Sequence, residues 1–273
     1  MHRLQVLTVV MGLVFLSLLC GCAAPSGQTP AAPPDQTPAA PSGQTPAVPS
    51  EQTPAAPSGQ TPAPPGGADW RSNFDLSPDD LSTTGRNPFF TLEPGFQLIL
   101  EGGGEKLTIT VLNETETVGE FTTRVVEERE EKNGELREVS RNYFAISKTT
   151  GDVFYFGEAV DIYQNGEVVR HEGAWRADEA DAKPGLIMPG NPAIGMKYYQ
   201  EVAPGKAMDR AEVVSLDETL RTPAGVFDEC LKTQETTPLN ALENEYKTYA
   251  PEIGLIQDER LLLTNYGFVE LED

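Results

Sequence analysis

The chain has 273 residues, of which 42 are Asp or Glu and 20 are Lys or Arg, so its formal net charge at pH 7 is −22. A balance this acidic argues against binding to nucleic acid and against direct docking on anionic lipid head groups. It favours solubility and leaves two interpretations open: a solvated acidic surface, or a surface that binds cations or a basic partner.

Residues 1–21 have the pattern of a signal peptide. Arg3 precedes an apolar stretch at residues 6–19, which is shorter than the roughly 20 residues needed to span a bilayer. The stretch ends in Leu-Leu-Cys-Gly-Cys at residues 18–22, which resembles a bacterial lipobox. The resemblance implies cleavage before Cys22 and acylation of Cys22 with diacylglycerol and palmitate. It places the protein on the cell membrane or outer membrane, facing outside the cytoplasm. The alternative is an uncleaved membrane helix.

Residues 22–68 are predicted to form a lipidated N-terminus and a disordered linker. From Pro25 the unit Pro-Ser-Gly-Gln-Thr-Pro-Ala-Ala repeats, and glutamines mark five copies. Such a segment has too little apolar bulk to bury a core, and its prolines bias it toward polyproline II. At about 3.1 Å per residue, it would reach on the order of 140 Å when fully extended. The segment is either a spacer that lifts the domain off its membrane or a repeat expansion with no length requirement.

Cysteine usage limits the chemistry of the mature chain. Cleavage removes Cys20 and acylation consumes Cys22, which leaves Cys230 and no intrachain disulfide. Cys230 stands among alternating apolar residues, so we expect a small buried hydrophobe rather than a nucleophile.

Residues 69–85 are a polar lead-in, and residues 86–273 are predicted to form one antiparallel β domain. In the lead-in, Ser77 followed by proline and acids is typical of the start of a short helix. Asn-Gly pairs at residues 133–134 and 165–166 each separate two alternating runs, which is the strongest short-range signal for a hairpin. We expect one face of this meander to be apolar and the other to be charged. The charged face is assigned four residues: Glu127, Glu128, Arg137 and Glu138.

Further alternating runs follow between residues 196 and 271, and no long amphipathic helix is expected after residue 85. The predicted fold class is therefore all-β. We expect a twisted antiparallel meander that forms a half-barrel or open barrel, with at most one or two short helices.

Residues 177–193 interrupt the alternation with prolines and glycines around an apolar triplet, so a long loop is predicted there. Exposed apolar residues on such a loop are typical of a ligand pocket. The alternative is that the loop plugs the open side of the sheet and packs as core. The candidate ligand-lining residues are Trp175, Leu186, Ile187, Met188, Tyr198 and Tyr199.

The chain offers little catalytic chemistry. His171 is the only histidine after cleavage, whereas zinc sites need three or four converging ligands. There is no strained Gly-x-Ser-x-Gly turn, phosphate loop or dinucleotide motif. We therefore predict no enzymatic activity, no catalytic residue, no metal and no cofactor. Calcium binding stays open near Asp79 and Asp80 and near Asp178, Glu179 and Asp181, although neither spacing matches an EF-hand.

Three motifs carry a resemblance to known proteins: Asn-Pro-Phe-Phe at 87–90, Thr-Pro-Ala-Gly-Val-Phe at 222–227 and Tyr-Ala-Pro-Glu-Ile-Gly-Leu at 249–255. Together they resemble a group of uncharacterised secreted or lipid-anchored bacterial proteins, over most of residues 87–271. Their layout of turns and strands also resembles the lipoprotein-carrier (LolA-like) class, whose sheet folds around an apolar cavity. The resemblance implies that fold and an apolar-ligand site, and it carries over no catalytic residue.

Two functions follow from the sequence. The first is a surface-tethered lipoprotein with a non-enzymatic binding or envelope-associated domain. Its partners would be the membrane, through the N-terminal lipid, and either an apolar small molecule or an envelope protein. The second is a structural or interaction module with a filled core that uses an acidic face for a protein partner or for cations.

Overall fold

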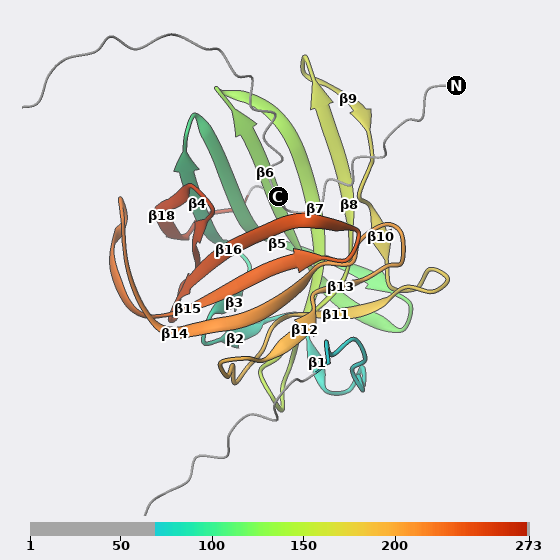
Figure 1. The fold of residues 1–273 in the computed structure, drawn as a ribbon. Helices are drawn as coiled ribbons and strands as arrows, with labels where there is room; N and C mark the ends of the chain where they lie inside the picture. The colour runs from blue at the N-terminus through green and yellow to red at the C-terminus, as the bar shows by residue number, and fades with distance from the viewer. Residues whose placement is uncertain (1–68, 272–273) are drawn as a thin grey trace, which may run out of the picture. The chain divides into compact units, whose positions relative to one another are not determined.

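The computed structural model describes residues 69–271, and within that range the chain forms strands, turns and irregular segments without a helix (Figure 1). The predicted all-β class is confirmed. The predicted signal peptide, the acylation site Cys22 and the linker lie outside the described residues.

The described residues form eighteen strands. Their bounds are β1 Leu81–Ser82, β2 Gly85–Asn87, β3 Phe90–Leu92, β4 Phe96–Gly102, β5 Glu105–Val118, β6 Phe121–Lys132, β7 Glu135–Ser147, β8 Val153–Gln164, β9 Glu167–Arg170, β10 Trp175–Arg176, β11 Lys183–Met188, β12 Lys197–Tyr199, β13 Glu201–Val202, β14 Arg210–Thr222, β15 Gly225–Thr237, β16 Asn240–Ala250, β17 Gly254–Asp258 and β18 Leu261–Phe268.

One large antiparallel sheet runs in the order β12-β14-β15-β16-β17-β18-β4-β5-β6-β7-β8-β11-β13. Its two ends, β12 and β13, are consecutive in the chain: β12 pairs with β14, and β13 pairs with β11. The sheet therefore curls until its ends nearly meet, which gives a nearly closed barrel with one unsealed seam. In Figure 1, β14 to β16 cross in front of β5 to β8.

The two Asn-Gly pairs make the hairpins that the sequence predicts. They join β6 to β7 and β8 to β9. Asn133 and Gly134 have φ of 53° and 79°, and Asn165 and Gly166 have φ of 53° and 81°. A type I′ turn needs positive φ at both central residues, which asparagine and glycine tolerate better than other residues do.

Two local predictions are wrong. The helix start at Ser77 is a single turn, in which the Asp80 amide donates to the Ser77 carbonyl at 3.0 Å, and the chain then enters β1. The Asp80 carboxylate is held instead by the Ser147 hydroxyl at 2.6 Å. The predicted loop at residues 177–193 contains β11, because Lys183–Met188 find partners on both β8 and β13.

The polar lead-in packs on the barrel. Arg71 forms a parallel bridge with Tyr198. The ring of Trp70 meets Tyr199 edge-on at 6.2 Å, and Phe74 meets Phe154 at 5.6 Å. Residues 69–85 therefore share contacts with the domain that follows.

The small β2–β3 hairpin bridges three turns of the barrel. The Asn87 side-chain amide donates to the carbonyls of Gly151 at 2.8 Å and Pro189 at 3.0 Å. The Glu252 amide donates to the Pro88 carbonyl at 2.8 Å. Asn87 is 2% exposed, and its bond to the Pro189 carbonyl is shielded from water. These bonds hold the following Phe89 and Phe90 against the barrel core.

Candidate functional site

A hollow in the barrel interior is the candidate functional site, and we call it the apolar pocket. Its void measures about 60 Å³, room for a few water molecules. Only one of its lining residues, Glu128, is charged. The lining residues are Phe90, Thr91, Phe96, Leu98, Ile109, Val111, Val126, Glu128, Phe144, Ile187, Met188, Tyr249, Ile253, Gly254 and Leu255.

The register of the sheet explains the apolar wall. Leu98 of β4 lies opposite Ile109 of β5, and Val111 of β5 lies opposite Val126 of β6. Since side chains alternate along a strand, these inward positions line one side of the hollow. Two residues beyond Val126, the same face of β6 presents Glu128 instead of an apolar side chain.

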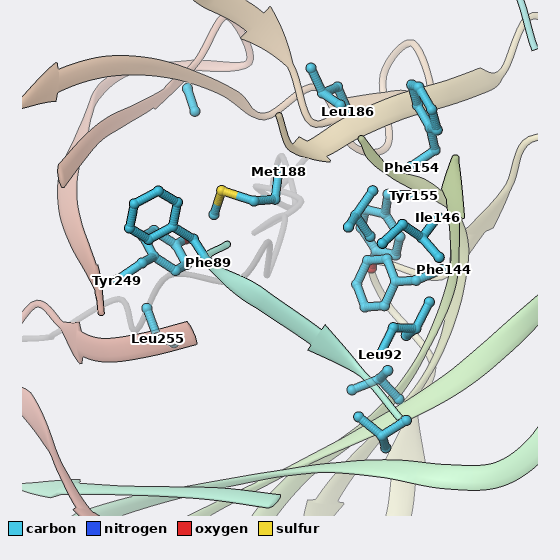
Figure 2. Packing of buried hydrophobic residues seen from close by; sticks show 14 of the residues in the cluster. Phe89, Leu92, Phe144, Ile146, Phe154, Tyr155, Leu186, Met188, Tyr249 and Leu255 are labelled. Carbon is cyan, nitrogen blue, oxygen red and sulfur yellow. The ribbon is translucent and has the colours of Figure 1, made fainter. Parts of the chain in front are cut away.

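The β2–β3 hairpin and β11 cover the pocket. Phe90 packs edge-on against Phe144 with ring centroids 5.4 Å apart. Figure 2 shows Met188 pointing toward Phe89 and Tyr249. Phe90, Ile187 and Ile253 are only half-buried, so they mark where the pocket meets solvent.

Glu128 is the polar feature of the pocket. It is 5% exposed, and no hydrogen bond or ion pair within residues 69–271 reaches its carboxyl group. Burial raises the pKa of this carboxyl to about 7. Lys247 lowers the pKa somewhat, while Glu130 and Asp258 raise it. Near neutral pH, Glu128 is therefore present in both protonated and charged forms.

Beyond Glu128 lies what we call the acidic cluster: Glu130, Glu138, Glu235, Glu245, Lys247 and Asp258. Lys247 is 2% exposed, and its ammonium group lies 3.2 Å from Glu235 and 3.7 Å from Asp258. Burial lowers the pKa of Lys247, but Asp258 and Glu235 outweigh burial and raise it well above its usual value. Glu235 also accepts hydrogen bonds from Gln200 at 3.1 Å and Thr233 at 3.0 Å.

Other members of the acidic cluster hold protons more tightly than a free glutamate. Burial raises the pKa of Glu130 to about 7 and that of Glu138 and Glu245 to about 8. Neighbouring carboxyls add to the effect, since each disfavours a second negative charge nearby. The interior is therefore poised to take up or release protons near neutral pH.

A second set of buried acids lies near the seam. Burial raises the pKa values of Glu158, Glu201 and Asp209 well above their usual range. The charge of Glu158 raises the pKa of Glu201 further, and that of Glu201 raises the pKa of Asp209. Burial of several adjacent charges is unfavourable, so these surroundings favour the protonated form of each carboxyl, and Lys247 opposes the effect only in part at Glu201 and Asp209.

The structure brings two of the six sequence-predicted site residues into the pocket, Ile187 and Met188. Leu186, 2% exposed, packs in the core, and Tyr198 is buried. Trp175 packs edge-on against Tyr155 at 5.3 Å, and Tyr199 lies beside Trp70. The loop thus contributes both to the pocket wall and to the core.

Sequence reasoning missed Glu128 as a site residue, because it assigned Glu128 and Glu138 to the solvent-facing side. That assignment is wrong: both face the barrel interior. Consecutive strand residues point to opposite faces, so Glu127 and Glu128 cannot share one. Because side chains alternate between the two faces of a strand, an inward-facing Val126 identifies Glu128 as inward-facing too.

Two further residues are placed by the structure. His171 is exposed, with Nδ1 2.8 Å from an Asp161 carboxylate oxygen. Cys230 is fully buried, as expected, and burial raises the pKa of its thiol to about 11.

Within the described part of the chain, no group of three or more His, Cys, Asp or Glu side chains is arranged to hold a metal ion. No helix among residues 69–271 has the length and apolar character needed to cross a bilayer.

Comparisons with protein-family models, curated proteins and solved structures find no match to this chain. The resemblance to lipid-anchored bacterial proteins and to the lipoprotein-carrier class stays a prediction.

Proposed function

We propose that the protein is a surface-tethered bacterial lipoprotein whose β domain binds an apolar molecule without catalysing a reaction. The observation that carries this proposal is the apolar pocket, in whose wall only Thr91, Glu128 and Tyr249 carry polar side-chain groups. Pockets of this kind, with few polar groups among apolar side chains, are the usual form of small-molecule sites. The hairpin tether at Asn87 supports a pocket that is preformed rather than assembled on binding.

A matched pair of variants tests binding to the pocket. Ile187→Glu places a charge at the half-buried mouth, whereas Ile194→Glu places the same charge at a residue that is 55% exposed and does not line the pocket. We expect the full chain to enhance the fluorescence of an apolar dye such as N-phenyl-1-naphthylamine. Ile187→Glu should abolish the enhancement and Ile194→Glu should leave it. Equal enhancement in both variants would refute binding at this pocket.

The second candidate function is a structural or interaction module with a filled core. The burial of Leu186 and Met188, 2% and 1% exposed, favours it, because these two residues occupy part of the interior that a ligand would need. Purification of the native protein followed by mass spectrometry separates the two functions. A co-purified apolar small molecule supports binding, and a partner protein without one supports the interaction module.

The proposed anchor is tested separately. Cys22→Ala removes the acylation site, so the variant should leave the membrane fraction while the wild-type chain stays in it. A variant that is still held in the membrane would contradict anchoring through Cys22.

A further inference from the structure

The carboxyl group of Glu128 suggests what kind of molecule the apolar pocket binds. Resting on the proposed function, we propose that the ligand is a cationic amphiphile: an apolar group carrying a protonated amine that pairs with the Glu128 carboxylate.

The position of Glu128 supports this assignment. The residue lines the pocket at the point where its wall changes from apolar to acidic. Its carboxyl has no hydrogen-bond or ion-pair partner among the described residues, although it is 5% exposed. A buried carboxyl without a partner is unfavourable in its charged form. A ligand ammonium at this point would supply the missing partner.

The surrounding charges favour a cation over an anion. Glu130 on β6 and Asp258 on β17 both act on Glu128 with negative charge, and Lys247 on β16 is the opposing cation. Lys247 already pairs with Glu235 and Asp258. Glu128 in turn acts on Glu138 of β7 and on Tyr155 and Glu158 of β8. Acids therefore outnumber cations around Glu128, and an anionic head group would be repelled there.

The change from apolar to charged side chains seen on β6 recurs on a second strand, so it belongs to the pocket and not to one strand alone. On β16, Tyr249 lines the pocket, and Lys247, two residues earlier on the same face, belongs to the acidic cluster. A ligand lying along these strands would place its apolar part beside Val126 and Tyr249 and its polar end beside Glu128.

Three ligands with the same tail test the proposal: octylamine, octanol and octanoate, titrated into the full chain by calorimetry at pH 6 and pH 8. At pH 8 we expect octylamine to bind about tenfold or more tightly than octanol, and octanoate to show no binding. Octylamine should bind several-fold more weakly at pH 6, where Glu128 is more protonated. Octanol or octanoate binding as tightly as octylamine would overturn the inference and leave the proposed function standing. No binding by any of the three would overturn both.

Glu128→Gln and Glu127→Gln form a matched pair for the same titration. Glu127 lies on the other face of β6, where it pairs with Arg141 at 3.3 Å. Glu128→Gln should remove the preference for octylamine over octanol while octanol still binds. Glu127→Gln should keep the preference. If Glu128→Gln fails to fold, the ligand series and the pH dependence of binding to the wild-type chain still test whether the pocket prefers a cationic ligand.

Discussion

Two regions of the barrel interior, the apolar pocket and the acidic cluster, are built by the same strands but differ in what stabilises them. On β6 the inward positions change from Val126 to Glu130 within four residues, and on β16 they change from Tyr249 to Lys247. The apolar side gains free energy simply by leaving water. The acidic side loses free energy on burial unless its carboxyls are protonated or paired with Lys247. One fold therefore contains apolar side chains whose burial does not depend on pH beside carboxyl groups whose burial does, and Glu128 marks the boundary between them.

Lys247→Met should produce the largest effect, because it leaves Glu235 and Asp258 buried without their cation. Removing one member of a buried ion pair costs about 3–5 kcal/mol. We expect that loss in the free energy of unfolding at pH 8, measured with urea. The loss should be smaller at pH 5, because burial raises the pKa of Asp258 and protonation removes the charge that Lys247 balances.

The matched control is Lys232→Met on the neighbouring strand β15, where Lys232 lies 5.2 Å from the ring of Tyr246, an exposed residue. That change should cost at most about 1 kcal/mol. Equal losses in the two variants would show that burial does not determine how much Lys247 contributes to the free energy of unfolding.

The pH profile of stability should give the next largest effect. The pKa of Glu128 is raised from 4.5 to about 7, so its contribution to stability is present below pH 4.5 and is lost as pH rises through 7. Such a shift corresponds to on the order of 3 kcal/mol. Glu138 and Glu245, with pKa values of about 8, extend the decline to higher pH. The free energy of unfolding should therefore fall between pH 5 and pH 9.

Glu128→Gln sharpens this prediction, since glutamine stays neutral throughout. The variant should be more stable than the wild-type chain at pH 8, by on the order of 1–3 kcal/mol, and its profile should be flatter. Glu127→Gln is the control with an unchanged profile. Asp80, Glu93 and Asp178 have lowered pKa values and titrate below this window. A stability that rises from pH 5 to pH 9 would contradict the inward placement of ionisable Glu128.

Much of the meander was predictable because its signals are local. Asn-Gly turns and alternating runs each span a few residues, and both appear in the structure as β6–β7 and β8–β9. Closure of the barrel has no comparable local signal in the sequence. It depends on residues 197–202 pairing with β14 at one end and β11 at the other. The same non-local pairing turned the proline-rich segment around Pro184 into a strand, against its composition.

The candidate site was predicted only in part for a related reason. Ile187 and Met188 were found because an apolar triplet among prolines is conspicuous in the sequence. Glu128 was not, because an acid in an alternating strand is normally solvent-facing. Phe90 was recognised only as part of the Asn-Pro-Phe-Phe motif at residues 87–90, and its place on the pocket depends on how Asn87 tethers the hairpin.

Asn87→Ala tests that tether. The change leaves the carbonyls of Gly151 and Pro189 without their donor and should cost about 1–2 kcal/mol in the free energy of unfolding. Amide hydrogen exchange should rise in residues 85–92 and remain unchanged in β14 and β15. Uniformly faster exchange over the whole barrel would show that Asn87 supports the fold at large rather than the pocket cover.

Arg86→Gln, one residue away, should give the smallest effect and completes the comparison. Arg86 pairs with Glu93 at 2.7 Å, a shorter distance than Lys247 to Glu235, yet its side chain is 46% exposed against 2% for Lys247. Water screens an exposed pair and already solvates both charges, so little is lost when one is removed. The urea midpoint should stay within measurement error and should not respond to salt beyond the wild-type chain. A loss as large as that of Lys247→Met would mean that the distance between two charges, and not their burial, determines how much an ion pair stabilises this protein.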